Sequence, residues 1–183
     1  EEIQAYAPRT LTGAMLSSSE NVTSGMVYGV DGLKESQVSK LKLAMTQGGY
    51  LSNVDGEILL GEQLADLLEV NLGDRLVVTV SEAHGGELSQ ALFRVSGLFS
   101  FNERTMDIGM AFINLSQAQK LLNIKGVHEV ALRLQHLTQA EDKQLAFWQA
   151  LNNEQLETLS WQELVPQLSS MLAMTQYSTL IVR

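Results

Sequence analysis

The residue types that most often carry chemistry are absent or scattered in this chain. It contains no cysteine, which excludes disulfides, thiolate metal sites and cysteine nucleophiles. Its three histidines, His84, His128 and His136, match no short-range ligand motif, and a metal site needs several convergent ligands. His128 and Glu129 are neighbours, so on a strand their side chains point to opposite faces. We therefore expect no catalytic residue and no metal site.

Serines, carboxylates and glycines also lack the spacing of catalytic or nucleotide-binding motifs. No serine lies in a G-x-S-x-G elbow, and the glycines form neither a dinucleotide fingerprint nor a P-loop. Acidic residues are numerous, but nothing around them predicts the burial that raises a carboxyl pKa for acid catalysis. We expect no cofactor and no enzymatic activity. The less favoured alternative is a hydrolase or transferase built from scattered Ser, His and Asp residues.

The acidic composition limits the partners of the chain. Its 183 residues include 12 Lys and Arg against 21 Asp and Glu, which gives a net charge of −9. Binding to nucleic acid or to an anionic membrane surface depends on clustered Lys and Arg, so we expect neither. The hydrophobic fraction of 45% is ordinary for a chain that buries a core.

Hydrophobic periodicity and turn residues predict strands that alternate with helices, which is an α+β fold. Residues 75–80 form the clearest strand, and His84-Gly85-Gly86 is the turn that leads to its partner. Two stretches, 138–141 and 160–163, match the capping box that opens a helix. The expected strands are 9–16, 25–30, 57–61, 75–80, 91–99, 110–113, 127–134 and 156–159, and the expected helices are 36–46, 62–68, 116–122, 138–151 and a terminal helix from 160.

The order of these elements indicates two lobes. One lobe would combine residues 1–52 with residues 124–175, and a smaller β-rich lobe would span the middle, residues 53–123. The last residues of the chain become apolar, as in Leu180-Ile181-Val182. We interpret residues 176–183 as the start of a transmembrane helix and the chain as a domain cut from a longer protein.

Five segments share their order and spacing with a known family, and they cover nearly the whole chain. They are Gly29–Asp31, Ile58–Ala65, Val70–Leu76, Phe93–Phe99 and Ile113–Leu122. Together they resemble the periplasmic core domain of MacB-like ABC transporter permeases. The segment Ser160–Leu164, which precedes an apolar stretch, is especially similar to the lipoprotein-releasing permeases of the LolC/LolE type.

The resemblance implies a periplasmic domain inserted between the first and second transmembrane helices of a four-helix permease of the bacterial inner membrane. Family members have a porter-like lobe built from both chain ends and a smaller, sabre-like lobe from the middle. Such permeases form dimers, with a second copy or a paralogue, and work with a cytoplasmic ATPase. ATP hydrolysis would belong to that ATPase. This domain would couple its motion to the extrusion or release of an envelope substrate such as a lipoprotein.

One departure from the family pattern concerns the hairpin between the middle strands. LolC-type permeases carry a longer excursion here, which engages a periplasmic lipoprotein carrier. Residues 81–87 are too short for such a hook, so the resemblance does not extend to carrier binding through this loop. The chain fits a LolE-like partner subunit or a permease for another substrate, and a periplasmic carrier or adaptor protein stays open as a partner.

A candidate surface for substrate or partner lies in the middle of the chain. Residues 100–108 mix apolar and charged side chains between two strands, as exposed binding loops often do. We place this surface at Phe99, Phe101 and Met106. The alternative to a permease domain is a freestanding periplasmic binding or adaptor module, which predicts a natural C-terminus near Arg183.

Overall fold

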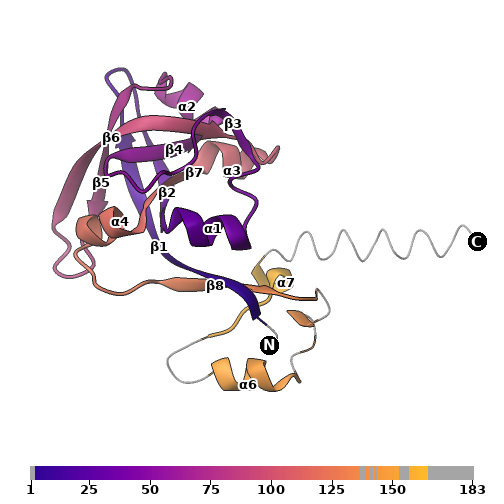
Figure 1. Cartoon of the computed structure of the whole chain (residues 1–183). Coiled ribbons are helices and arrows are strands. Elements are labelled where there is room, and N and C mark those ends of the chain that lie inside the picture. Colours follow the sequence, from indigo (N-terminus) through magenta and orange to yellow (C-terminus); the bar gives the residue numbers. More distant parts are fainter. Residues whose placement is uncertain (1–2, 137–138, 141, 143, 153–156, 165–183) are drawn as a thin grey trace, which may run out of the picture. The chain divides into compact units, whose positions relative to one another are not determined.

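The computed structural model describes residues 3–136, 139–140, 142, 144–152 and 157–164. The chain divides into two compact units, one of residues 3–133 and one of residues 1–2 with 134–183. The first unit contains the β-sheet, whose strands are joined by short helices (Figure 1).

The elements of the unit 3–133 follow one another in a simple order along the chain. The strands are β1 (Ile3–Ser17), β2 (Val22–Val30), β3 (Met45–Gly48), β4 (Glu57–Gly61), β5 (Arg75–Ser81), β6 (Leu88–Phe99), β7 (Met110–Asn114) and β8 (Glu129–Leu134), and the helices are α1 (Gly32–Val38), α2 (Glu62–Leu68), α3 (Arg104–Gly109) and α4 (Leu115–Leu122). Strands β1 and β2 form one antiparallel hairpin, and β5 and β6 form another. Strands β4 and β7 each run directly into a helix.

Six of the eight strands close into a barrel. The order around the ring is β1, β2, β7, β4, β6, β5 and back to β1, so each of these strands has a paired neighbour on both sides. The β1–β5 seam that closes the ring is short, from Met15↔Thr79 to Ser17↔Val77. Strand β3 pairs with β6 outside the ring, and β8 pairs with β1. Closure leaves few unpaired strand edges, which are the places where open sheets associate.

The barrel interior is apolar because every second residue of its strands points inward. On β5, for example, Leu76, Val78 and Val80 are buried in this interior. Full burial of one such side chain stabilises the fold by roughly 1.5–3 kcal/mol. Helices α2 and α4 contribute to the same cluster through Leu64, Ala65, Leu68, Ala118, Leu121 and Leu122.

A second apolar cluster covers part of the outer face of the barrel. Tyr28 and Phe112 are partners in the β2–β7 register and stack with 5.2 Å between ring centroids. Their neighbours Val27 and Ala111 point the other way, into the barrel. The connection from α1 to β4 supplies the cover, and the buried members of the cluster are Val30, Leu41, Leu51, Leu59, Phe99 and Phe112.

The predicted helix at 36–46 is wrong. Helix α1 begins four residues earlier, after its cap Asp31, and ends at Val38. The chain then turns, and residues 45–48 form β3 against β6. The physical reason is that the apolar residues of this stretch do not share one helical face, since Leu41 is fully buried whereas Leu43 is 84% exposed.

The other predicted elements of the unit 3–133 are confirmed to within a few residues at their ends. The strands at 9–16 and 25–30 are parts of β1 and β2. The strand–helix pair at 57–68, the hairpin at 75–99 and the strand–helix pair at 110–122 are all present. The predicted α+β class is therefore confirmed.

The second unit is described only in part. Its helices are α6 (Ala146–Leu151) and α7 (Trp161–Leu164), and Trp148 donates from Nε1 to the carbonyl of Gln139 at 2.8 Å. The Glu163 half of the capping box at 160–163 is confirmed, because Glu163 accepts from the backbone N–H of Ser160 at 2.7 Å. No helix among the described residues is both long enough and apolar enough to span a membrane.

Two predictions for this unit are wrong where its residues are described. The expected helix 138–151 is interrupted at Asp142, and residues 157–159 form no strand. The capping-box match that begins at Thr138 and the expected membrane helix at 176–183 lie outside the described residues. The division into lobes at 1–52 with 124–175 and 53–123 stays a prediction, although β1 and β2 belong to the same barrel as β4–β7.

Candidate functional site

A bidentate ion pair joins three elements of the unit 3–133. The guanidinium of Arg9 on β1 donates to both carboxylate oxygens of Glu35 on α1, at 2.9 Å from Nε and 2.7 Å from Nη2. Its Nη1 also donates to Glu129 on β8 at 3.1 Å. The exposed fraction of the side chain is 1% for Glu35, 21% for Arg9 and 42% for Glu129. We call these three residues the Arg9 clamp.

The local sequence around α1 explains how Glu35 reaches this position. The side chain of Asp31 caps the helix by accepting from the backbone N–H groups of Leu33 and Lys34, at 3.1 and 3.3 Å. The backbone N–H of Glu35 then donates to the carbonyl of Asp31 at 2.8 Å, which closes the first turn. Because α1 packs against β1, this turn directs Glu35 into the sheet rather than into solvent.

The clamp lies where β1 changes its neighbours. From Arg9 onward β1 pairs with β2, whereas its earlier residues run beside β8 (Figure 1). We call β8 and the part of β1 before Arg9 the β1–β8 ribbon. The backbone N–H of His128 donates to the carbonyl of Arg9, and the N–H of Leu11 donates to Nδ1 of His128, both at 2.9 Å. The base of the ribbon is therefore fixed by backbone and side-chain contacts together.

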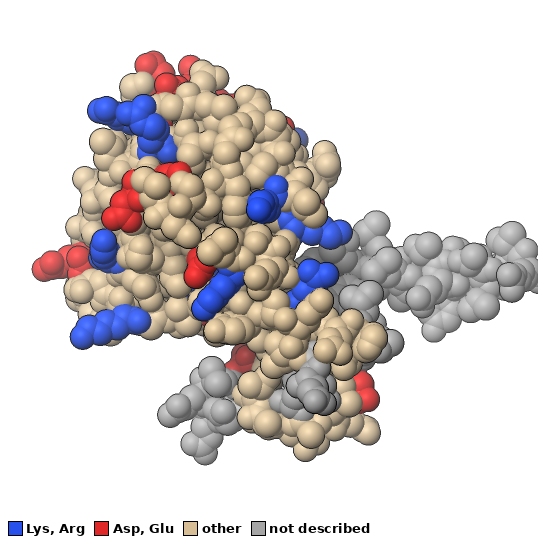
Figure 2. Space-filling view, in the orientation of Figure 1, with Lys and Arg blue, Asp and Glu red and all other residues tan. Residues whose placement is uncertain are grey.

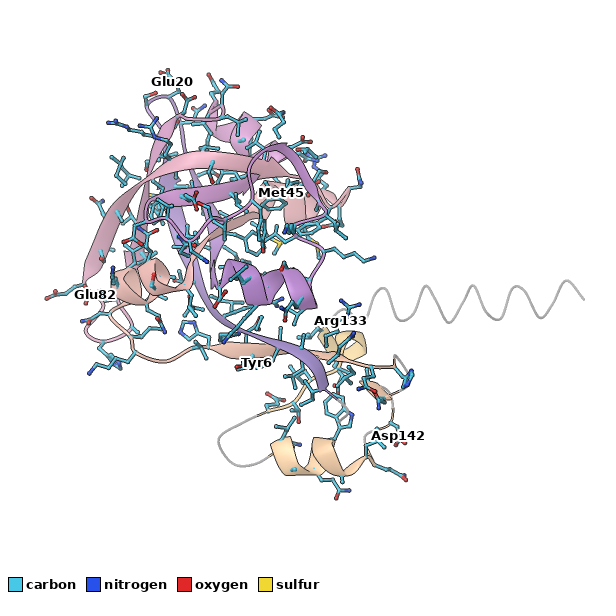
Figure 3. The ribbon with its side chains drawn as sticks, in the orientation of Figure 1. Tyr6, Glu20, Met45, Glu82, Arg133 and Asp142 are labelled. Carbon is cyan, nitrogen blue, oxygen red and sulfur yellow. The ribbon has the colours of Figure 1, made fainter. Side chains whose placement is uncertain are left out.

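Two weaker contacts tie the ribbon to α1 farther along. The ammonium of Lys34 lies 4.7 Å from the centroid of the Tyr6 ring on β1. Arg133 on β8 donates from Nη1 to the carbonyl of Gln37 at 3.1 Å. Figure 3 labels Tyr6 and Arg133 on the two strands of the ribbon.

The electrostatics of the clamp favour the charged form of Arg9. Burial works against the charge of Arg9, but hydrogen bonds and attraction to Glu35 and then to Glu129 outweigh it, so the pKa of Arg9 is raised. Burial and the charge of Glu129 raise the pKa of the nearby Tyr28. A guanidinium does not release its proton near neutral pH. The arrangement thus suits mechanical attachment and not proton transfer.

Sequence reasoning did not find the clamp. Its members lie 26 and 120 residues apart, so no local spacing relates them. The sequence signal that could have indicated it is Glu35, a charged residue at a buried position of α1. This signal can be recognised only when the true start of the helix is known.

The predicted surface at Phe99, Phe101 and Met106 is only partly exposed. Phe99 is fully buried in the second apolar cluster, and its ring centroid lies 5.4 Å from the ring centroid of Phe112. Phe101 packs against that cluster with 5.2 Å between its ring centroid and that of Phe99, while Met106 on α3 is 39% exposed. The structure thus brings the two phenylalanines together and leaves Met106 as the most exposed of the three.

The loop that carries these residues is held in place by a buried carboxylate. Asp107 is 2% exposed and accepts from the hydroxyl of Ser100 at 2.6 Å and from the backbone N–H of Phe101 at 2.7 Å. Glu103 caps α3 by accepting from the N–H of Met106 at 2.8 Å. Backbone hydrogen bonds from Met106 and Thr105 lower the pKa of Glu103. This loop is therefore a formed structure with an exposed tip.

The remaining predicted features show no chemical site. His84 lies in the turn between β5 and β6. This turn consists of residues 82–87 and is short, as the sequence predicted. In the part of the chain that the structure describes, no group of His, Asp and Glu side chains could hold a metal ion. On the face in Figure 2, basic and acidic side chains are interspersed over the described residues.

Known proteins with similar sequences are lipoprotein-releasing permeases. The chain is 33% identical over 147 residues to the lipoprotein-releasing system transmembrane protein LolC of Xylella fastidiosa strain Temecula1, and equally so to LolC of strain 9a5c. Each match covers 74% of this chain and 36% of the relative, so the chain spans about a third of the length of these proteins. No protein-family model matches the chain.

Solved structures with a similar fold come from the same class of transporter. The extracellular domain of the ABC-type transporter YknZ from Gram-positive bacteria aligns with a TM-score of 0.56 at 12% identity, over 77% of this chain and 70% of that one. The periplasmic region of MacB from Actinobacillus actinomycetemcomitans aligns with a TM-score of 0.55 at 18% identity, over 82% of this chain and 68% of that one.

Proposed function

This chain is related in sequence to the lipoprotein-releasing permease LolC and has the fold of MacB-like periplasmic domains, and from this relationship we propose that it is the periplasmic domain of an ABC transporter permease in a bacterial inner membrane. A cytoplasmic ATPase would hydrolyse ATP, and a second permease copy or a paralogue would complete the transporter. The domain itself would catalyse no reaction. It would couple the motion of the ATPase to the extrusion or release of an envelope substrate, with lipoprotein as the first candidate.

The observation that supports the coupling role is the Arg9 clamp. A coupling domain has to convert a displacement at its attachment into a displacement of its whole body. The clamp joins the β1–β8 ribbon to α1 and to the barrel at one point, through charge-assisted hydrogen bonds of 2.7 to 3.1 Å. In a permease, the chain before β1 and the chain beyond the second unit, which follows β8, would continue toward the membrane. Motion would then enter the barrel through the ribbon.

The proposal is tested in the full-length permease together with its ATPase. In Arg9→Ala the ribbon loses its strongest attachment to α1 and keeps the two weaker ones, so ATP hydrolysis should continue while lipoprotein release from inner-membrane vesicles to an acceptor falls strongly. The matched control is Arg133→Ala, which removes an arginine from the same ribbon that makes one exposed hydrogen bond to a carbonyl. Because this contact is only one of the weaker ties between the ribbon and α1, the Arg133→Ala permease should release lipoprotein much faster than Arg9→Ala.

Two results would contradict the proposal. If the folded Arg9→Ala permease released lipoprotein as fast as the unaltered protein, the clamp would have no part in coupling. If the unaltered permease and its ATPase released no lipoprotein and extruded no other envelope substrate, the assignment to a transporter would fail.

The exposed tip of α3 is the surface that we propose for contact with the substrate or with a carrier protein. Met106 and the accessible part of Phe101 would make the contact, and the buried Phe99 would support them from below. Methionine adapts its shape to varied apolar partners, which suits this role. Met106→Glu should reduce substrate release without altering ATP hydrolysis, whereas Leu43→Glu, at an apolar residue that is 84% exposed elsewhere, should leave release unchanged.

A further inference from the structure

An open cleft of about 570 Å³ lies beside strands β5 and β6, where it is lined in part by Arg75, Arg94, Leu92 and Val54. Arg75 and Arg94 are direct partners in the β5–β6 register, so their side chains lie on the same face of the sheet. Like charges directly opposite each other on neighbouring strands destabilise a sheet. The net charge of the chain is −9, so two adjacent cations differ in sign from the chain as a whole.

The two arginines are not neutralised within the described part of the chain. Neither forms a salt bridge there, and the described contact of the Arg94 guanidinium is one hydrogen bond from Nη1 to the carbonyl of Gly73 at 3.0 Å. Both residues are exposed. Most of their N–H donors are therefore available to a ligand that carries negative charge.

The two carboxylates that also line the cleft already have partners. Asp55 lies 3.7 Å from the ammonium of Lys120. Glu57 accepts from the backbone N–H of Ser52 at 2.9 Å and from its hydroxyl at 2.6 Å. These acids would repel a compact dianion such as phosphate more strongly than a single carboxylate, because repulsion grows with the charge on the ligand.

The backbone beside the cleft offers hydrogen bonds to an extended chain. Strand β4 pairs with β6 only from Glu57↔Arg94 onward, and the N–H of Arg94 donates to the carbonyl of Gly56. Since backbone groups alternate along a strand, the N–H and C=O of Leu92 point toward the same side, where no strand of the described chain pairs with them. The side chains of Leu92 and Val54, exposed to 56% and 59%, add apolar surface.

We propose that this cleft binds an extended peptide segment of a partner protein, in which apolar residues lie two positions before and two positions after a carboxylate side chain. Arg75 and Arg94 bind the carboxylate, Leu92 pairs with the peptide backbone, and Leu92 and Val54 contact the apolar neighbours. Addition of a strand to a sheet in this way combines backbone hydrogen bonds, which give affinity, with side-chain contacts, which give specificity. The inference does not depend on the proposed transport function, since it concerns binding alone.

The test uses the 183-residue chain and the fluorescent heptapeptide Thr-Val-Thr-Glu-Thr-Val-Thr, titrated by fluorescence anisotropy, because valines two positions from the glutamate lie on the same face of a strand as the glutamate. The peptide should bind saturably, and NMR should place the largest amide shifts at Leu92 and its neighbours. Replacement of both arginines, Arg75→Gln with Arg94→Gln, should weaken binding about tenfold or more, because charge-assisted hydrogen bonds are lost. The double variant should fold at least as stably as the original chain, since it relieves like-charge repulsion.

Matched controls separate the parts of the proposal. Arg133→Gln removes an arginine outside the cleft and should leave the affinity unchanged. The same heptapeptide with glutamine in place of the glutamate should bind about tenfold or more weakly because it lacks the charge, and the glutamate heptapeptide that is N-methylated at alternate residues should bind weakly because it cannot donate to a strand. Equal binding of the neutral or the methylated peptide would overturn the proposal. So would inorganic phosphate that competes at the same concentration as the peptide, because the site would then be a simple anion site.

Discussion

The strand–helix pair β4–α2 and the strand–helix pair β7–α4 are built in the same way. Each strand passes into its helix without a loop, through Gly61 (φ −59°, ψ 143°) in one and Asn114 (φ −63°, ψ 139°) in the other. Each helix ends at a residue in the left-handed region, Glu69 with φ 53° and Asn123 with φ 54°. The chain thus uses one local design twice.

The strand pairings extend this likeness to the whole barrel. Strand β4 runs parallel to β6, the second strand of one hairpin, and β7 runs parallel to β2, the second strand of the other. Strands β4 and β7 pair antiparallel with each other, as β1 and β5 do. Exchanging the first half (β1, β2, β4, α2) with the second half (β5, β6, β7, α4) therefore leaves every pairing of the ring unchanged.

The two halves differ in the connection that leads to each strand–helix pair. The first connection, from β2 to β4, contains α1, β3 and the cover of the second apolar cluster. The second, from β6 to β7, contains only α3. Each buries one carboxylate, Glu35 in the first and Asp107 in the second, but Glu35 binds a distant guanidinium and Asp107 binds its own loop. The repeated parts build the barrel, and the unrepeated parts give each half its separate role.

The largest effect should come from the ion pair that only the first half contains. Arg9→Ala leaves Glu35 buried without its cation, and such a loss costs about 3–5 kcal/mol. Urea unfolding of the chain would measure it. Glu129→Gln at the exposed end of the clamp should cost under about 1 kcal/mol, as exposed ion pairs do. Equal losses for the two variants would mean that burial of Glu35 does not set the strength of the clamp.

The next effect concerns the first residue of each strand–helix junction. A Cβ built on Gly61 would lie 2.1 Å from the backbone carbonyl oxygen of Asp107, so Gly61→Ala should cost about 3 kcal/mol through overpacking. The glycine is needed for this close approach of α3, since its φ is ordinary. Asn114→Ala at the corresponding position should cost only about 1 kcal/mol, the value of its hydrogen bond to Val54. Thermal unfolding of both variants would compare them.

A smaller effect is expected for the buried carboxylate of the second half. Asp107→Asn keeps an acceptor for the N–H of Phe101 but weakens two charge-assisted bonds, so it should cost about 1–2 kcal/mol. It should also increase hydrogen exchange of the amides in residues 100–108, while the amides of α1 stay protected. Exchange that increased in both connections would show that the two carboxylates are coupled, against the comparison made above.

The smallest effect should distinguish the two helix ends. Both Glu69 and Asn123 adopt positive φ, where glycine is favoured and asparagine is tolerated better than glutamate. Glu69→Gly should therefore stabilise the chain by up to about 0.5–1 kcal/mol, and Asn123→Gly by less. The pair is matched, because each replacement removes one exposed side-chain hydrogen bond, to Asn21 or to Glu82. A larger gain at Asn123 would contradict this account.

The sequence predicted the repeated parts of the fold well and the unrepeated parts poorly. Strand β5 alternates clearly between buried and exposed residues, and helices α2 and α4 bury one face each, so local periodicity was sufficient there. The stretch 36–46 has no such periodicity, because Leu41 is buried by contacts that are distant in sequence. The incorrect helix at this point also hid the burial of Phe99, which the same stretch covers.

The candidate sites show the same contrast between local patterns, which the sequence displays, and contacts between distant residues, which it does not. The family resemblance indicated the type of protein, because it rests on short segments whose residues are close together in the sequence. The Arg9 clamp arises from the packing of α1 and β8 against β1, and it joins residues 26 and 120 positions apart. The arginine pair of the cleft arises from the β5–β6 register, which joins residues 19 positions apart. No local pattern carries such pairings, so only the folded chain reveals them.

The short β1–β5 seam has a consequence for how the chain folds. Each half can form its hairpin from residues close in sequence, but the seam joins Met15 to Thr79 across most of the first half of the unit. Contacts of this separation are formed against a large loss of loop entropy and slow the folding of β-rich domains. The β2–β7 pairing, which joins Met26 to Met110, is also distant in sequence. We therefore expect formation of the ring through these two pairings to limit the folding rate, so that replacements within either pairing slow refolding more than equally destabilising replacements inside either hairpin.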